Sequence, residues 1–82
     1  MDDLYLNIVS PEKSIFEGEI SRVTLPGTKG SFTILPQHAP IISSLRKGSL
    51  SYVTMDGEEC KLEIKEGFVE LSNNVVSVCV NV

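Results

Sequence analysis

The chain contains no tryptophan, one histidine (His38), one alanine and two cysteines (Cys60 and Cys79) among its 82 residues. A single histidine cannot form a two-histidine metal site, and the two cysteines lack the C-x-x-C spacing of metal and redox motifs. Two cysteines are also fewer than a small secreted domain uses for its disulfide framework, so we expect two reduced, buried thiols on strands, with a structural disulfide as the alternative. A dyad of His38 with either cysteine is the remaining catalytic alternative. We expect no catalytic residue, no metal site and no bound cofactor.

Positive charge is sparse: the chain has seven basic and eleven acidic residues, which gives a net charge of -4. The basic residues are also scattered along the sequence. Binding of nucleic acid or of an anionic membrane surface needs a basic cluster, and none is visible, so we expect neither partner. Asp2 and Asp3 stand where a secretory signal would carry basic residues. The uncharged stretch from Gly30 to Leu45 is too short to cross a bilayer as a helix, and Pro36 and Pro40 would interrupt one. We therefore expect no direct membrane insertion, and this stretch must be buried in the fold or covered by a partner.

Period-two alternation of apolar and more polar residues dominates the chain and predicts strands. The apolar members of the alternating runs are Leu4, Leu6 and Ile8; Phe32 and Ile34; Cys60, Leu62 and Ile64; and Val76, Val78, Val80 and Val82. Turn signals separate these runs at the spacing of about 8–12 residues that is typical of all-β domains. They are Ser10-Pro11, Glu17-Gly18, Pro26-Gly27, Pro36 to Pro40, Lys47-Gly48, Asp56-Gly57, Glu66-Gly67 and Asn73-Asn74. The pattern predicts a single all-β domain over residues 1-82, either a sandwich or a barrel.

The pair Asp56-Gly57 is the strongest hairpin signal, and two registers are compatible with it. A two-residue loop would put Leu50 and Tyr52 on the polar face of the following strand. A three-residue loop with its glycine in the left-handed conformation sets Tyr52 opposite Cys60 and Leu50 opposite Leu62, all on one apolar face. We prefer the three-residue loop, because a slip of one residue would turn that face outward.

Three further patterns have both an ordinary and a functional interpretation. Gly27-Thr28-Lys29-Gly30 lacks the GxxxxGK[ST] pattern of a phosphate-binding loop, so we expect a tight turn that needs positive φ. His38 is either a turn histidine bonded to the backbone or part of an exposed contact face. A group of acidic residues is expected on a solvated strand face rather than at a metal or acid/base site. Its members are Glu58, Glu59, Glu63, Glu66 and Glu70.

The run Gly-Thr-Lys-Gly-Ser-Phe-Thr-Ile-Leu-Pro-Gln-His-Ala-Pro, from Gly27 to Pro40, resembles the signature of the epsilon subunit of F-type ATP synthase. Its specific part is the Leu-Pro-x-His-Ala-Pro block. The resemblance extends in order over essentially the whole chain. Its further segments are Leu6 to Glu12, Phe16-Glu17-Gly18, Leu45 to Gly48, Glu66 to Glu70 and Asn73-Asn74-Val75. It implies a small β-sandwich of about ten short strands.

The resemblance also implies a non-catalytic role in the central stalk. Such a subunit packs on gamma, rests on the ring of c subunits, and helps to couple ring rotation, driven by protons or sodium ions, to ATP synthesis. The residues implied at the gamma-facing side are His38, Ala39, Pro40, Ile42 and Ser43. The residues implied near the polar loops of the c ring are Thr28, Lys29, Gly30 and Ser31. Ser31 replaces an acid found in relatives, which leaves Lys29 as the alternative for an ion pair with the ring.

Many members of the family continue into a helical hairpin, for which this chain has no residues. We therefore expect a naturally short subunit, with a truncated chain or a split gene as the alternative. The expected location is the cytoplasmic face of the bacterial inner membrane, where the complex would hold the chain peripherally. A free-standing β-sandwich that binds a peptide or small ligand is the second hypothesis, and a small enzyme, which lacks a set of catalytic groups, is the third.

Overall fold

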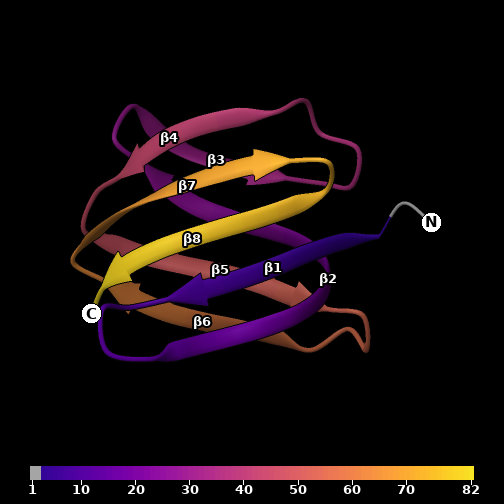
Figure 1. The fold of residues 1–82 in the computed structure, drawn as a ribbon, viewed down its shortest axis with the longest axis horizontal. Coiled ribbons are helices and arrows are strands. Elements are labelled where there is room, and N and C mark those ends of the chain that lie inside the picture. Colours follow the sequence, from indigo (N-terminus) through magenta and orange to yellow (C-terminus); the bar gives the residue numbers. More distant parts are fainter. Residues whose placement is uncertain (1–2) are drawn as a thin grey trace.

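The computed structural model describes residues 3–82, and all regular elements in this range are strands, which confirms the all-β prediction. The strands are β1 (Leu4–Val9), β2 (Ser14–Gly27), β3 (Gly30–Ile34), β4 (Ile41–Leu45), β5 (Gly48–Thr54), β6 (Glu59–Ile64), β7 (Glu66–Ser72) and β8 (Val75–Asn81) (Figure 1). The described residues thus form eight strands, so the expected number of about ten is wrong.

Two of the predicted turn signals belong to a strand, because Gly18 lies inside the 14-residue strand β2 and Pro26-Gly27 are its last two residues, directly before the next turn. The ring of Phe16 covers Gly18: a Cβ on this glycine would lie 3.2 Å from Cζ of Phe16. Pro26 is compatible with the strand because it lies near the strand end, opposite Ser31 of β3, and its carbonyl still accepts a bond of 2.9 Å from the Arg46 N–H. The two short strands predicted on either side of Gly18 therefore form one strand, which lowers the strand count.

The strands form two layers (Figure 1). The first sheet contains β4, β7, β8 and β1, in that order, and the second contains β3, the C-terminal part of β2, β5 and β6. All pairs are antiparallel except β1 with β8. Strand β2 joins the layers, because its N-terminal part pairs with β1 and its C-terminal part with β3 and β5. The change follows a bulge at Ser21, whose hydroxyl donates to the Val53 carbonyl at 3.3 Å.

Apolar side chains from both sheets form one core cluster. Its buried members are Leu4, Leu6, Ile8, Ile20, Val23, Leu25, Ile34, Leu45, Leu50, Tyr52, Ile64, Val69, Leu71, Val76, Val78 and Val80. The predicted alternation in the first and last strands is confirmed, except that Val82 is 54% exposed. Cys60 and Cys79 lie on strands as predicted and are free thiols, but both are half-buried rather than buried.

The hairpin of β5 and β6 has the predicted three-residue loop. Leu50 pairs with Leu62, and Tyr52 pairs with Cys60. Gly57 adopts a φ of 86°, the left-handed conformation that the loop requires of its last residue. This register turns the apolar side chains of both strands toward the core.

Candidate interaction surface

The residues predicted to approach the c ring form the tight turn between β2 and β3. Gly27 pairs with Gly30 across the turn, so that Thr28 and Lys29 are its two-residue loop. Gly30 has a φ of 132°, and a Cβ on Gly27 would lie 2.7 Å from the carbonyl oxygen of Gly30, so the backbone geometry requires both glycines. The Thr28 N–H donates to the Ser44 carbonyl at 3.1 Å, and the two hydroxyl groups are also 3.1 Å apart. All four predicted residues, Thr28 to Ser31, are exposed on this turn, which is fixed to β4.

The residues predicted to face gamma divide between a loop and a strand. His38, Ala39 and Pro40 are exposed in the loop between β3 and β4. The His38 N–H donates to the Leu35 carbonyl at 3.2 Å, and Nδ1 of His38 lies 2.7 Å from the Ala39 carbonyl oxygen. His38 is therefore bonded to the loop backbone, as the turn interpretation expects, and its side chain is exposed; its place in a contact face stays a prediction.

Ile42 and Ser43 follow on β4 and lie on opposite faces of the strand. Ile42 is 77% exposed, whereas the half-buried Ser43 lies opposite the buried Val69 of β7. Both residues line a hollow of about 530 Å³ together with the turn Thr28 to Ser31. The structure thus brings Ile42 and Ser43 beside the turn Thr28 to Ser31, whereas His38, Ala39 and Pro40 lie in the loop at the other end of β4.

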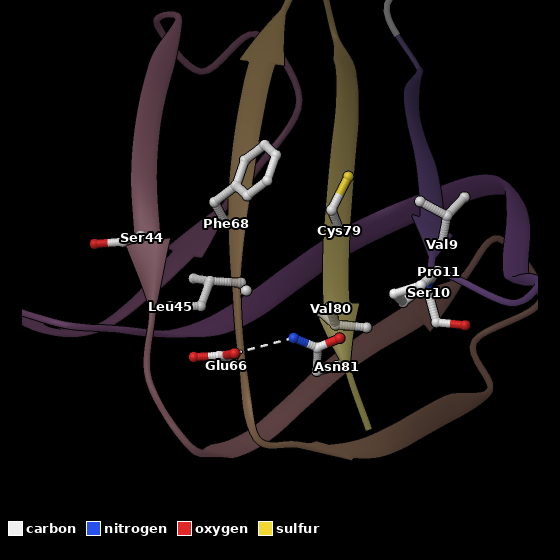
Figure 2. A pocket seen from close by; sticks show the side chains of 11 residues that line it. Val9, Ser10, Pro11, Ser44, Leu45, Glu66, Phe68, Cys79, Val80 and Asn81 are labelled. Atoms are coloured by element: carbon white, nitrogen blue, oxygen red, sulfur yellow. Dashed lines mark hydrogen bonds between the residues drawn. The ribbon is translucent and has the colours of Figure 1, made fainter.

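The outer face of the first sheet carries a row of side chains that sequence reasoning missed. Phe68 lies opposite Ser44 of β4 and Cys79 of β8, and Cys79 lies opposite Val9 of β1. The row lines a groove of about 550 Å³. Figure 2 shows Phe68, Cys79 and Val9 side by side on the adjacent strands β7, β8 and β1. The groove ends at a hydrogen bond of 3.0 Å between the Asn81 side-chain amide and the Glu66 carboxylate (Figure 2).

Large apolar side chains are exposed on this outer face. They are Ile42 (77% exposed), Phe68 (51%) and Val75 (43%). Single exposed apolar residues are ordinary on a protein surface, but several on one sheet face are typical of a protein contact. A signal for Phe68 exists in the sequence, because it directly precedes Val69 in an alternating strand and must point the other way when Val69 is buried.

The charged residues on the strands of the outer face are acidic. Glu66 and Glu70 lie on β7, and Glu17 and Glu19 lie where β2 pairs with β1. The Tyr5 hydroxyl donates to the Glu17 carboxylate at 2.7 Å, and this bond raises the pKa of Tyr5 because it stabilises the protonated phenol. The strand-borne basic residues, Arg22 and Lys61, belong to the second sheet.

The outer side of the second sheet is polar by contrast. The hydroxyl groups of Thr24 and Thr33 are 2.9 Å apart, and the Ser49 hydroxyl donates to the Glu63 carboxylate. Among residues 3–82, the large exposed apolar side chains lie on the first sheet, in loops or at the C-terminal end, and not on the strands of the second sheet. The two sheets therefore differ in the partners that they can accept.

The predicted group of acidic residues does not form one site. Glu58, Glu59, Glu63, Glu66 and Glu70 are all exposed, as expected. They divide between the β5–β6 loop, β6 of the second sheet and β7 of the first. Within residues 3–82, histidine, cysteine and acidic side chains form no group of three that could hold a metal ion. No helix in that range is long and apolar enough to span a membrane.

Comparisons with known proteins connect this fold to one family. Residues 3–82 match the family model described as ATP synthase, Delta/Epsilon chain, beta-sandwich domain. The ATP synthase epsilon chain of a Nitratiruptor species is 40% identical over 80 residues, which are 98% of this chain and 62% of that protein. The ATP synthase epsilon chain of Desulfitobacterium hafniense is 44% identical over 73 residues, which are 89% of this chain and 54% of that protein. The chain thus spans somewhat more than half the length of these relatives.

Solved structures show the same fold at lower sequence identity. A chain of the Euglena gracilis mitochondrial ATP synthase, from a structure of OSCP, F1 and the c-ring, superposes with a TM-score of 0.90 at 18% identity and covers 98% of this chain and 51% of that one. A chain of the Tetrahymena thermophila mitochondrial ATP synthase, from a structure of the central stalk and c-ring, superposes with a TM-score of 0.78 at 19% identity. The match covers 96% of this chain and 63% of that one. At these identities the likeness shows the fold, and the family follows from the sequence matches. The chain belongs to the family of ATP synthase delta/epsilon chain β-sandwich domains, which confirms the resemblance found in its sequence.

Proposed function

We propose that this chain is a non-catalytic subunit in the central stalk of a proton- or sodium-translocating F-type ATP synthase. It would pack on gamma, rest on the c ring, and help to couple ring rotation to ATP synthesis. The observation that carries the proposal is the exposed apolar face of the first sheet, on a chain whose family is that of the epsilon subunit. A subunit that acts by contact needs a docking face rather than a catalytic centre. The complex would hold it peripherally at the cytoplasmic face of the bacterial inner membrane.

The outer face of the first sheet is the proposed gamma-binding surface. Its exposed apolar side chains include Phe68 on β7 and Ile42 on the edge strand β4, and Glu66 and Glu70 flank Phe68 on β7. Interface cores are depleted in charge and enriched in aromatic and aliphatic anchors, with charged groups at the rim. The proposed surface runs from the loop His38 to Pro40, past Ile42, to the groove beside Phe68. Ser43, half-buried on the other side of β4, would contribute at the hollow that it shares with Ile42.

The turn Thr28 to Ser31 is the proposed c-ring contact. Its residues are exposed, and Lys29 offers a positive charge to an acidic residue of a ring loop. Such an exposed ion pair contributes only about 0–1 kcal/mol, so shape and backbone contacts of the turn would supply most of the affinity. The bonds from Thr28 to Ser44 link this turn to β4, which also carries Ile42. One strand would therefore connect the two proposed partners.

The test is a titration of this chain with the gamma subunit of the same organism, followed by calorimetry. We expect a stable one-to-one complex, and we expect Ile42→Asp to weaken it at least about tenfold, because a carboxylate in an apolar contact is desolvated without a partner. The control is Thr33→Asp, which adds the same charge to an exposed position on the polar outer side of the second sheet. The control should bind gamma like the unchanged chain.

The two ways of failing have different meanings. If folded Ile42→Asp binds gamma as tightly as the unchanged chain, the outer face of the first sheet is not the contact. If the unchanged, folded chain does not bind gamma, the stalk function is wrong, and the groove beside Phe68 becomes the site of a free-standing binding module.

A further inference from the structure

The loop that presents His38 contains a turn in an unfavourable conformation. The His38 N–H donates to the Leu35 carbonyl at 3.2 Å, with Pro36 and Gln37 as the two central residues. Gln37 has a φ of 66°. Proline at the second position and positive φ at the third are the features of a type II β-turn, which normally has glycine at the third position. A glutamine adopts this conformation only when its surroundings hold it there.

The side chain of Asn74 supplies that hold. The Gln37 N–H donates to Oδ1 of Asn74 at 2.6 Å, although the two residues are 37 positions apart in the chain. Asn74 lies in the turn between β7 and β8 with a φ of 63°, which asparagine tolerates better than most residues. Its backbone carbonyl accepts a second bond, of 2.8 Å, from the Tyr5 N–H of β1. One residue thus joins β1, the β7–β8 turn and the loop of His38.

The bond to Asn74 distinguishes between two forms of the Leu35–His38 turn. A type I turn would give Gln37 a negative φ and relieve the backbone strain. Its central peptide plane, between Pro36 and Gln37, is rotated by roughly half a turn relative to type II, so the Gln37 N–H would point away from Asn74. The acceptor on Asn74 therefore favours the type II form over the form that the sequence alone would favour.

We propose that Asn74 is a positioning residue for docking. Its amide oxygen holds the Pro36–Gln37 peptide in the type II orientation and so presets the loop His38 to Pro40 for the gamma subunit. This inference rests on the function proposed above. Without the bond, the loop divides between two forms, and only the fraction in the competent form binds.

Three single variants and one double variant of the 82-residue chain test the proposal. Asn74→Gly keeps the positive φ but removes the acceptor, and Asn74→Asp keeps an acceptor at the same place. Asn73→Gly is the matched control, because Asn73 lies in the same turn with a φ of 52° and does not hold Gln37. The readouts are the exchange rate of the Gln37 amide hydrogen, measured by NMR, and the affinity for gamma, measured by calorimetry.

We expect Asn74→Gly to raise the exchange rate of the Gln37 amide and to lower the affinity for gamma, each by about 5- to 10-fold, the size that one hydrogen bond supports. Asn74→Asp and Asn73→Gly should stay within about twofold of the unchanged chain in both readouts. Adding Gln37→Gly to Asn74→Gly should restore most of the affinity, since glycine adopts the positive φ without help.

A purely structural role in the β7–β8 turn predicts something else. Asn73→Gly and Asn74→Gly would then lower the melting temperature alike and leave the gamma affinity unchanged, which would overturn the proposal. Unchanged exchange of the Gln37 amide in Asn74→Gly would also overturn it. If the unchanged chain fails to bind gamma, the proposed function and the docking role of Asn74 both fall, whereas the exchange data still decide whether Asn74 fixes the turn.

Discussion

Tyr52 is the one hydroxyl-bearing side chain among the buried residues of the described chain. Its ring packs against that of Phe16, with centroids 4.4 Å apart, and it lies opposite Cys60 in the hairpin register. Burial withholds water from the phenolate form, and the neighbouring Cys60 adds to the effect, so the pKa of Tyr52 is raised above 10.0. The folded chain therefore resists ionisation of Tyr52 more than the unfolded chain does.

This difference predicts a loss of stability at high pH. Because the pKa of Tyr52 is higher in the folded state, its contribution is complete below the unfolded value, about 10, and is lost as the pH rises through the folded value. We expect the free energy of unfolding, measured in urea from pH 8 to 11, to fall more steeply for the unchanged chain than for Tyr52→Phe. Tyr5 titrates in both proteins and does not affect the comparison. Parallel curves would contradict the raised pKa.

The β5–β6 hairpin offers a test at the level of the element. Leu50 and Leu62 are opposite each other in its register, but Leu50 is fully buried and Leu62 is half-buried. Leu50→Ala should lower the free energy of unfolding by about 2–5 kcal/mol, and Leu62→Ala by roughly half as much, because less of its side chain leaves water on folding. Thermal or urea unfolding of both variants measures this. An equal loss, or a larger loss for Leu62→Ala, would contradict the facing of β6.

This hairpin and strand β2 show which elements the sequence predicts. Asp56-Gly57 combines a turn dipeptide with alternating flanks, and both sources of information select the same register, which the structure has. Gly18 and Pro26-Gly27 are turn signals without that support; Gly18 lies inside β2, and Pro26-Gly27 form the end of that strand. What keeps Gly18 in a strand is the ring of Phe16 above it together with the pairing of β2 to β1, and the second of these is a long-range contact. Glycine or proline alone therefore predicts too many turns.

The candidate interaction surface was only partly predictable from the sequence, because part of it depends on long-range strand pairing. The turn Thr28 to Ser31 and the loop at His38 are contiguous in sequence, so a motif can point to them. The row of Phe68 extends across strands that are far apart in the sequence, and it exists only once β4, β7, β8 and β1 are placed side by side. Alternation places Phe68 outward, but it cannot place Cys79 and Val9 beside it. The bond from Gln37 to Asn74 is likewise a product of the tertiary fold.

At the level of the whole molecule, β2 makes the two sheets one mechanical unit. It pairs with β1 of the first sheet and with β3 and β5 of the second, and it contributes Ile20, Val23 and Leu25 to the common core. Dense packing resists deformation, so force applied to one sheet reaches the other with little loss. The function proposed above, coupling of rotation between two partners, would need this property. It follows that the two sheets should lose their structure together.

Hydrogen exchange of the native chain tests this coupling. We expect the most protected amides of β8 in the first sheet and of β6 in the second to open with the same free energy. Val23→Ala, in the shared strand and fully buried, should lower both values equally, by about 2 kcal/mol. Val75→Ala is the control, since Val75 is 43% exposed on the outer face and should change neither value by more than about 0.5 kcal/mol. A fall confined to the second sheet would show that the sheets open separately, and a domain with two such parts would bend under load instead of transmitting torque.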